Sequence, residues 1–457
     1  MAFRKIFKRA RAIFFLAPFA AFLGFTIVPA SAQPLSLIRD TEIERVLKGY
    51  EDPILKVAGL DPAAVKIYIV NDPSINAFVA EGQNIFINTG LILELKTPNQ
   101  VIGVMAHETG HMAGGHLIRD TSAISKASIP MLIGMAVGIA AMALGGGDAG
   151  MAAIMMGQQA AQAQFLAFSR VQEATADQMG QRFLRATHQS GAGMLEVFQK
   201  FADEEAMSAA FKQPFVSDHP ASRERIDLLQ QLVDASPYKD VKDSPESVHE
   251  FHMIQAKLAG YLSDPDAVLT HYPVTDQSQE ARYARVMAYF RKPDLDKALV
   301  EANSLVKEEP KNPYFWEVLG QIYVEMSQPQ KGIGPYQKSV DLLPDAPLLR
   351  VSLAAAQLAT EKPALAKPAL ENLTVSLQQE NDNTFAWYES AQAYSLLGNT
   401  AMADLSTAER YYSAGAMPIA AQFAKRAETQ LTKGSPDWER ANDILIAVPQ
   451  AVKAQQQ

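Results

Sequence analysis

Two histidines four residues apart, His107 and His111, enclose Glu108 in the run His-Glu-Thr-Gly-His. Residues i and i+4 of a helix lie on one face roughly 6 Å apart, so both imidazoles can bind one cation. Zinc chemistry needs neutral imidazole ligands and a carboxylate close enough to take a proton from a water at the metal. The pattern predicts one zinc ion per chain, with both histidines as ligands and Glu108 as general base. The competing interpretation is a helix with two surface histidines.

Two histidines leave the metal one protein ligand short, and the chain offers two candidates. His116 follows the second histidine, but the extended pattern H-E-x-x-H-x-x-G-x-x-H requires its third histidine at position 117, which is Leu117. Glu173 is the other candidate, because Asp177 lies one turn further along the same helical face and can accept the ring N–H of a zinc histidine. We favour Glu173 as the ligand, since an acidic pair at this spacing is mildly repulsive without a cation.

Helices are predicted wherever apolar residues recur at helical spacing around these side chains. Residues 41–58 have an amphipathic pattern, although Gly49 and Pro53 should divide it. Pro98 begins the helix of the two histidines, and a helix over 171–185 carries the acidic pair. Shorter helices are predicted over 90–95, 194–211 and 222–235.

A small sheet is predicted beside the histidine helix. Residues 65–70 alternate in hydropathy, and two short strands over 77–80 and 84–88 are joined by Glu81-Gly82-Gln83 in a hairpin. The polar stretch 236–245 contains two prolines and marks a domain boundary. The strands and helices before this boundary predict an α+β domain.

The first 32 residues have the composition of a secretory signal peptide. Five cations precede an apolar run over 12–28, and Ala30-Ser31-Ala32 offers a small-residue cleavage site. Residues 1–32 are therefore expected to be removed near Ala32; an uncleaved membrane anchor is the alternative. The chain has no cysteine and can form no disulfide, and an exported protein of this kind indicates a bacterial periplasm.

The charge balance bears on the kind of partner. The formal net charge is −9, and removal of the five signal cations takes it to −14. Nucleic-acid binding needs a basic surface for the phosphates, so this acidic chain argues against nucleic acid as a partner.

A long, nearly uncharged segment follows the histidine helix. Residues 127–169 carry one charge, Asp148, and are rich in alanine, methionine and glycine. Their length and hydropathy permit a membrane span, but the glycines and the four glutamines of the second half argue against a membrane hairpin. We expect an apolar lid or a membrane-touching segment, with a true span or a buried core as the alternatives.

The C-terminal half carries a tetratricopeptide-repeat signature. The run 316–323 matches W-x2-L-G-x2-Y, and Tyr336 follows at the place of the repeat's next aromatic residue. Gly332 and Ser339 stand where the pattern prefers alanine. Residues 246–457 are predicted to be an array of such helix pairs, whose stacking forms a groove for peptides or partner proteins.

Several separate motifs resemble the gluzincin metallopeptidases, which include the CAAX prenyl proteases and HtpX. Besides the histidine motif they are Ile75 to Phe78, Ile85 to Gly90, Glu173 to Asp177 and His219 to Arg225. With the export signal and the repeats, the chain most resembles the periplasmic BepA-type branch, proteases and chaperone-like factors of outer-membrane protein quality control. The implied fold is an α+β zincin-like metallopeptidase domain over 33–240, followed by an all-α tetratricopeptide-repeat superhelix.

The resemblance also implies roles for the matching residues. His107, His111 and Glu173 would bind zinc. Glu108 would be the general base, and Asp177 would accept a hydrogen bond from the ring nitrogen of a histidine ligand that does not bind the metal. The chain would then be an exported zinc endopeptidase acting on unfolded or misassembled envelope proteins, with contacts to the outer-membrane assembly machinery through the repeats and to the membrane surface.

The His-Pro motif and one strand edge complete the expected site. By resemblance, His219 either caps the metal in a self-inhibited state or, with Arg225, stabilises the oxyanion. Substrate is expected to lie extended along Asn76, Ala77 and Phe78, since main-chain pairing holds a peptide without demanding a sequence.

Two other functions remain open at this point. The repeats could be the working part of a chaperone or scaffold whose metal site is latent. The chain would instead be an integral membrane metalloprotease if residues 127–169 spanned a bilayer.

Overall fold

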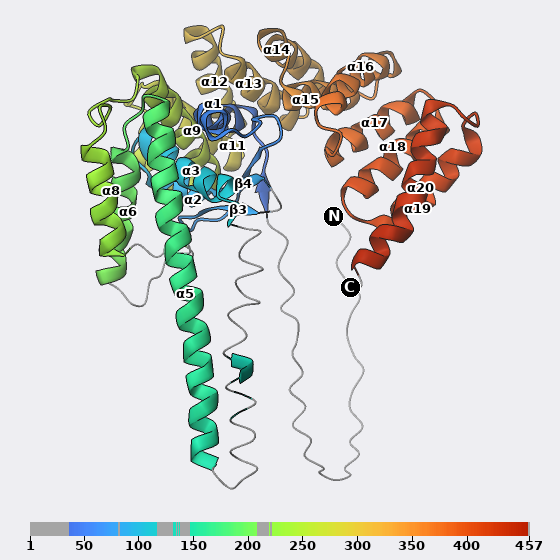
Figure 1. Cartoon of the computed structure of the whole chain (residues 1–457). Coiled ribbons are helices and arrows are strands. Elements are labelled where there is room, and N and C mark those ends of the chain that lie inside the picture. Colours follow the sequence, from blue (N-terminus) through green and yellow to red (C-terminus); the bar gives the residue numbers. More distant parts are fainter. Residues whose placement is uncertain are drawn as a thin grey trace, which may run out of the picture. The chain divides into compact units, whose positions relative to one another are not determined.

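The computed structural model describes residues 36–80, 83–116, 147–207 and 222–455, together with His219 and a few positions between 131 and 137 (Figure 1). The predicted signal peptide lies outside the described residues, as does most of the uncharged segment before Gly147. Predictions for these stretches therefore stay predictions.

A four-stranded sheet has the order β1-β2-β4-β3. Its strands are β1 (Leu37–Ile38), β2 (Lys66–Val70), β3 (Ala77–Ala80) and β4 (Asn84–Asn88). β3 and β4 pair in antiparallel fashion, which confirms the predicted hairpin, whereas β2 pairs with β4 in parallel. Tyr68 and Phe78 stack on opposite sides of Phe86, each with ring centroids 5.0 Å apart, and this aromatic row supports the register. In the described part of the chain, β3 pairs with β4 alone and forms an edge.

The first helix, α1 (Thr41–Ala58), is unbroken, so the predicted division at Gly49 and Pro53 was wrong. Pro53 lacks the N–H that would complete one helical hydrogen bond. The helix nevertheless buries a complete apolar face, which includes Leu47 and Ile54. Tertiary packing of such a face contributes more to helix stability than local propensity does.

Further helices complete this part of the described chain: α2 (Thr89–Glu94), α3 (Pro98–Ala113), α5 (Gly147–Ala186), α6 (Ala192–Met207) and α8 (Arg223–Asp234). The central helix is α3, which packs against α1, α5, α6 and β3. It begins where the sequence predicts, because Pro98 occupies the first turn and the Thr97 hydroxyl accepts a hydrogen bond from the Gln100 N–H at 3.3 Å.

The long helix α5 begins inside the uncharged segment, well before the predicted residue 171. Its early turns expose Met151, Met155 and Met156 to solvent. Across the residues described by the structure, no helix combines the length and apolar character needed to cross a membrane.

From Pro245 onward the described chain consists of helices: α9 (Pro245–Leu262), α10 (Pro265–His271), α11 (Gln279–Arg291), α12 (Leu295–Glu308), α13 (Pro313–Glu325), α14 (Pro329–Leu342), α15 (Pro347–Leu358), α16 (Pro363–Gln379), α17 (Thr384–Leu396), α18 (Thr400–Ser413), α19 (Met417–Gln430) and α20 (Pro436–Gln455). Consecutive helices pack against one another. The predicted division into an α+β part and an all-α repeat part is confirmed.

The repeat signature has a steric reason in the pair α13 and α14. A Cβ on Gly320 would lie 2.7 Å from the ring of Tyr336, and a Cβ on Gly332 would lie 2.9 Å from the Gly320 carbonyl oxygen. The Ser339 hydroxyl donates a hydrogen bond to the Pro313 carbonyl at 2.7 Å. The two departures from alanine therefore fit a close helix contact and a satisfied buried hydroxyl.

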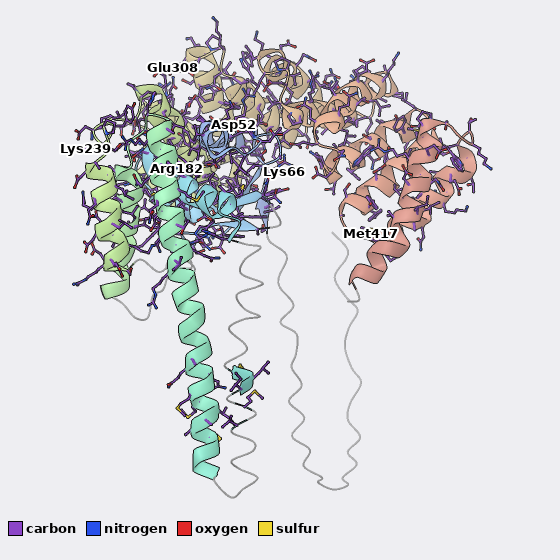
Figure 2. All side chains as sticks on the ribbon, in the orientation of Figure 1. Asp52, Lys66, Arg182, Lys239, Glu308 and Met417 are labelled. Atoms are coloured by element: carbon purple, nitrogen blue, oxygen red, sulfur yellow. The ribbon has the colours of Figure 1, made fainter. Side chains whose placement is uncertain are left out.

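The helix α9 also packs against the α+β part. Phe251 and other apolar residues of α9 belong to the same hydrophobic core as α1 and α3. Exposed ion pairs join the two parts further along, between Lys66 and Asp382 at 2.8 Å and between Arg39 and Glu380 at 2.6 Å (Lys66 is labelled in Figure 2). The domain boundary just before α9 stays a prediction of the sequence.

Candidate metal centre

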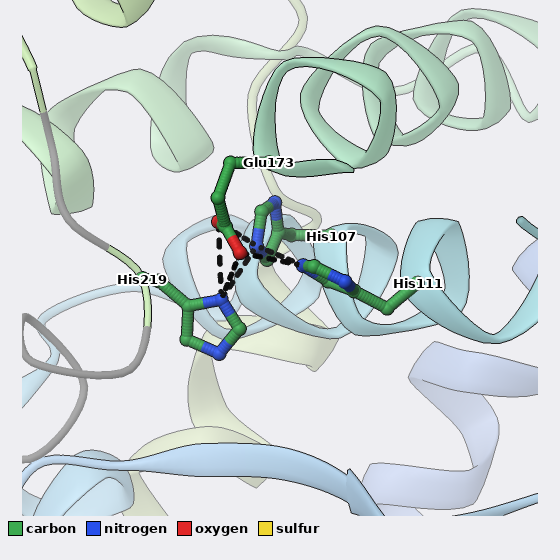
Figure 3. A group of neighbouring side chains, drawn as sticks. All are labelled: His107, His111, Glu173 and His219. Carbon is green, nitrogen blue, oxygen red and sulfur yellow. Dashed lines mark hydrogen bonds and ion pairs between the residues drawn. The ribbon is translucent and has the colours of Figure 1, made fainter. Parts of the chain in front are cut away.

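Side chains from α3, α5 and the segment before α8 converge on one point (Figure 3). His107, His111, Glu173 and His219 each direct one ligand atom there, and these atoms all lie within 4.8 Å of one another. The two α3 imidazoles approach with their Nε2 atoms 3.0 Å apart. Each of these nitrogens lies 3.4 Å from an oxygen of Glu173.

The spacing of these atoms fits a tetrahedral cation. Metal bonds of about 2.0–2.1 Å in a tetrahedron place the ligand atoms about 3.3 Å apart. The Nδ1 atom of His219 lies 3.2 Å from Nε2 of His107 and 3.1 Å from Oε2 of Glu173, close to that separation. Ring nitrogens that face one another at such distances are satisfied together by a central cation, so the residues present fit a divalent metal.

Glycines allow α3 and α5 to bring their ligands together. A Cβ on Gly110, inside the histidine motif, would lie 2.6 Å from the carbonyl oxygen of Ala176. A Cβ on Gly180 would lie 3.1 Å from the carbonyl oxygen of Ala106. The two backbones can approach this closely only because these side chains are absent. Sequence reasoning missed this role, although glycines inside two helical patterns were a usable signal.

Asp177 and Arg225 form a second layer behind the ligands. The Oδ1 atom of Asp177 lies 3.0 Å from Nδ1 of His107, as expected for a carboxylate that orients a zinc histidine. The guanidinium of Arg225 donates two hydrogen bonds to Asp177, at 2.8 and 2.9 Å, and lies 3.1 Å from Oε2 of Glu173. Arg225 is buried and is held by both carboxylates.

The protonation of Glu173, Asp177 and His111 suits a cation. Burial lowers the pKa of His107, but its hydrogen bonds with Asp177 and Glu173 outweigh burial and raise that pKa to about 9, so a metal must displace a proton from this ring. Burial opposes ionisation of Glu173, but the nearby His219 and the hydrogen bonds with His107 and His111 outweigh it and lower the Glu173 pKa. Burial also opposes ionisation of Asp177, whose pKa is nevertheless lowered by its hydrogen bonds with His107 and Arg225. Burial lowers the pKa of His111 to about 3. Two charged carboxylates and a neutral imidazole are the forms that bind a divalent metal.

Glu108 lies next to the ligand group. Its side chain is 1% exposed, and its Oε1 atom lies 3.5 Å from Nε2 of His219. His219 thus directs one ring nitrogen toward the ligands and the other toward Glu108. The structure therefore places the predicted base and the histidine of the His-Pro motif at the same point.

Two further aromatic residues border the site. His116 is outside the convergent group of the described residues; its Nδ1 lies 3.0 Å from Nδ1 of His111, the ring nitrogen that faces away from the metal point. The ring of Phe198 on α6 lies 5.1 Å from the His107 ring and 5.2 Å from Cζ of Arg225. Sequence reasoning missed Phe198, because a phenylalanine at helical spacing is usually a core residue.

The predicted substrate residues lie on or next to β3, which packs against α3. The side chains of Asn76 and Ala77 are buried, and that of Phe78 is half-buried against Phe86. Any contact of a peptide with this edge would therefore be made mainly by the backbone.

Comparison with known proteins gives a consistent family. The model of peptidase family M48 matches residues 38–233. The putative beta-barrel assembly-enhancing protease of Vibrio cholerae is 26% identical over 263 residues, which are 56% of this chain and 53% of that protein. The beta-barrel assembly-enhancing protease of Escherichia coli (strain K12) is 24% identical over 375 residues, 80% of this chain and 75% of its own.

A further relative matches a shorter stretch of the chain. Metalloprotease LoiP of Escherichia coli (strain K12) is 32% identical over 181 residues, 39% of this chain and 66% of its own. The chain spans about half the length of the Vibrio cholerae relative. The matched residues 38–233 contain the whole convergent group, so the part of the chain that holds the site matches peptidase family M48.

Proposed function

We propose that this chain is a zinc-dependent endopeptidase that is exported to the periplasm and cleaves extended segments of envelope proteins. The observation that carries the proposal is the convergence of His107, His111 and Glu173 beside Glu108. Two histidines and a glutamate are a ligand set of catalytic zinc in peptidases. When bound, zinc polarises a carbonyl group and lowers the pKa of a water.

The chain's own residues supply the rest of the mechanism. Glu108 takes a proton from the attacking water and passes it to the leaving amine. Asp177 holds the His107 ring through Nδ1, and Arg225 fixes Glu173 and Asp177. Because both carboxylates already bind its guanidinium, we assign Arg225 to positioning the ligand layer. His219 is then the residue that we assign to oxyanion stabilisation, in a state in which its ring has moved away from the metal ligands.

Removal of the metal tests this proposal. We expect purified protein to contain about one zinc ion per chain and to lose cleavage of an unfolded model protein after treatment with a chelator. Added zinc should restore the activity, since the His2Glu set binds it. Metal content by atomic spectroscopy and cleavage on gels are the measurements. Full cleavage by metal-free protein would contradict the zinc mechanism.

We propose that His219 occupies the fourth ligand position of the metal in the state seen here, and so closes the site to water. Its Nδ1 completes a closed group of ligand atoms, whereas a catalytic site needs an open position for water. The His219→Ala variant is therefore expected to cleave faster. If nine of ten molecules are capped, the gain is about tenfold. Initial rates on the same unfolded substrate measure it.

His249→Ala is the matched control for this variant, because His249 lies on α9 and pairs with Glu280. It should leave the rate unchanged. A fall of roughly 10²-fold or more in His219→Ala would instead assign His219 to oxyanion stabilisation.

Substrate is proposed to add as a strand beside β3. In the described residues this strand pairs on one side only, and it packs against the helix that carries the metal ligands. The side chains of Asn76 and Ala77 are buried, so the peptide would be held by main-chain hydrogen bonds. Such binding suits unfolded or misassembled proteins, which present extended backbone.

The repeats are proposed to bind protein partners. Two relatives are named for enhancing beta-barrel assembly, and stacked helix pairs offer concave surfaces for peptides or proteins. Contact with the outer-membrane assembly machinery is the partner class that this favours. A chaperone or scaffold with a latent metal site is the second candidate, and the capped geometry at His219 is the observation that favours it.

The early turns of α5 are proposed to touch the membrane surface or to cover the site as an apolar lid. Exposed methionines here, Met151, Met155 and Met156, belong to the uncharged segment and form an adaptable apolar surface.

A further inference from the structure

α1 places a carboxyl group against the back of α3. The Glu51 side chain is completely buried, and its Oε1 accepts a hydrogen bond from Oγ1 of Thr109. Thr109 is the residue that follows Glu108 in the histidine motif. The mechanism proposed above uses neither of these two side chains.

The geometry of a helix separates this contact from the metal. Successive residues are about 100° apart around the axis, so Thr109 points about 160° away from His111 and about 160° away from His107 in the other direction. Gly110 faces α5, where it contacts the Ala176 backbone. The turn that carries Glu108 is thus held on two sides, by α5 through Gly110 and by α1 through Thr109.

The direction of the Glu51 pKa shift favours a neutral acid as the partner of Thr109. Burial raises the pKa of Glu51 well above its usual range, and the nearby Glu108 charge acts in the same direction. Within the described residues, Oε2 of Glu51 has no hydrogen-bond partner. A buried carboxyl with so little compensation is stable only in its neutral form. Thr109 can still donate to it, and no second negative charge is placed behind Glu108.

We propose that Glu51 is a positioning residue, whose hydrogen bond with Thr109 sets the rotation of α3 about its axis. A side-chain tip lies roughly 6 Å from a helix axis, so a rotation of about 10° moves it by about 1 Å. Displacements of that size cost up to about 10²-fold in rate. The rotation places both histidine ligands and Glu108, so this inference rests on the proposed peptidase function for its effect on catalysis.

The zinc dissociation constant of the full-length chain tests the inference independently of activity. Thr109→Val keeps the shape of the side chain but removes the hydroxyl. We expect zinc to bind about tenfold more weakly, the lower end of the 10- to 100-fold cost of losing a partner that is bonded directly to a ligand, because this hydrogen bond acts on the ligands only through α3. Thr109→Ser keeps the hydroxyl and should bind zinc within about threefold of the parent chain. Glu51→Gln should do the same, because an amide oxygen accepts the hydrogen bond as a neutral acid does.

Tyr50→Phe is the matched control. Tyr50 precedes Glu51 in α1, but its hydroxyl donates to the Ser247 carbonyl of α9 at 3.3 Å, away from α3. Its loss should leave zinc affinity unchanged. Circular dichroism at the assay temperature shows that each variant is folded. In zinc-saturated protein, Thr109→Val should lower kcat and leave KM within about twofold, since the hydrogen bond affects placement and not substrate binding.

Equal zinc affinity of Thr109→Val and Thr109→Ser would overturn the inference. The inference would also be overturned if the Glu51→Gln variant bound zinc as weakly as the Thr109→Val variant. A neutral hydrogen-bond acceptor at position 51 would then not be enough to keep the zinc affinity. A parent chain that binds zinc but cleaves nothing would refute the proposed function, whereas the affinities would still decide the role of Glu51.

Discussion

Replacing Glu108 by glutamine is expected to abolish detectable cleavage while zinc stays bound. The amide has nearly the shape of the carboxylate, so the buried site beside His219 should stay folded. It cannot accept a proton from water, and general-base catalysis contributes roughly 10²- to 10⁴-fold to the rate. The measurements are the initial rate on an unfolded model protein and the zinc content of the same preparation.

Glu224→Gln is the control for this change, because Glu224 is exposed on the first turn of α8. Undiminished cleavage by Glu108→Gln would show that Glu108 is not the general base.

The same variant also distinguishes the two candidate functions in cells, the peptidase and the repeat-based chaperone. If cells with full-length Glu108→Gln keep an envelope as intact as cells with the parent chain do, proteolysis is not required there. That result would favour the chaperone or scaffold function of the repeats.

Replacing Lys257 by methionine is expected to destabilise the folded chain by about 3–5 kcal/mol. Lys257 lies on α9 and is 6% exposed. Its Nζ atom lies 2.6 Å from Oδ2 of Asp40 and 3.1 Å from Oε2 of Glu42, both at the start of α1. The Tyr283 hydroxyl of α11 donates to the same Glu42 oxygen at 2.7 Å.

The loss of stability is large because the substitution removes the cation but keeps both carboxylates. Without the ammonium group, Asp40 and Glu42 form a carboxylate pair with little solvent access, and uncompensated buried charge is costly. The free energy of unfolding in urea measures the loss. Burial raises the pKa of Glu42, so this carboxyl becomes neutral early as the pH falls. The difference from the parent should therefore shrink at low pH, because the variant then holds less uncompensated buried charge.

Lys292→Met provides the control. Lys292 pairs with Asp266, but both side chains are exposed. Exposed pairs contribute about 0–1 kcal/mol, so this variant should unfold nearly like the parent. A Lys257→Met chain as stable as Lys292→Met would show that the buried cluster does not join α1 to the repeat helices.

Local patterns predicted much of the fold. The β3–β4 hairpin and the start of α3 at Pro98 depend on turn and capping residues within a few positions, and both are confirmed. The unbroken course of α1 was not predicted, because the apolar face that stabilises it packs against distant elements. The parallel pairing of β2 with β4 was likewise absent from the prediction, since it joins strands that are separated by β3.

In the site, too, some features follow from local sequence and others from tertiary packing. The spacing of His107 and His111 follows from the helix repeat, so the sequence alone determined that they share a face and that Glu108 lies beside them. Tertiary structure alone decided that Arg225 is held by Asp177 and Glu173, and that Thr109 meets Glu51.

The physical reason is the range of the interactions. Helix periodicity, capping and hairpin turns are set by neighbours along the chain, and they left a readable pattern of ligands, base and repeats in this sequence. Which helix faces meet, and which buried charges compensate each other, depends on packing between segments that are far apart in sequence. Gly110 shows the difference: its place in the motif was visible, but its contact with Ala176 exists only once α3 and α5 pack together.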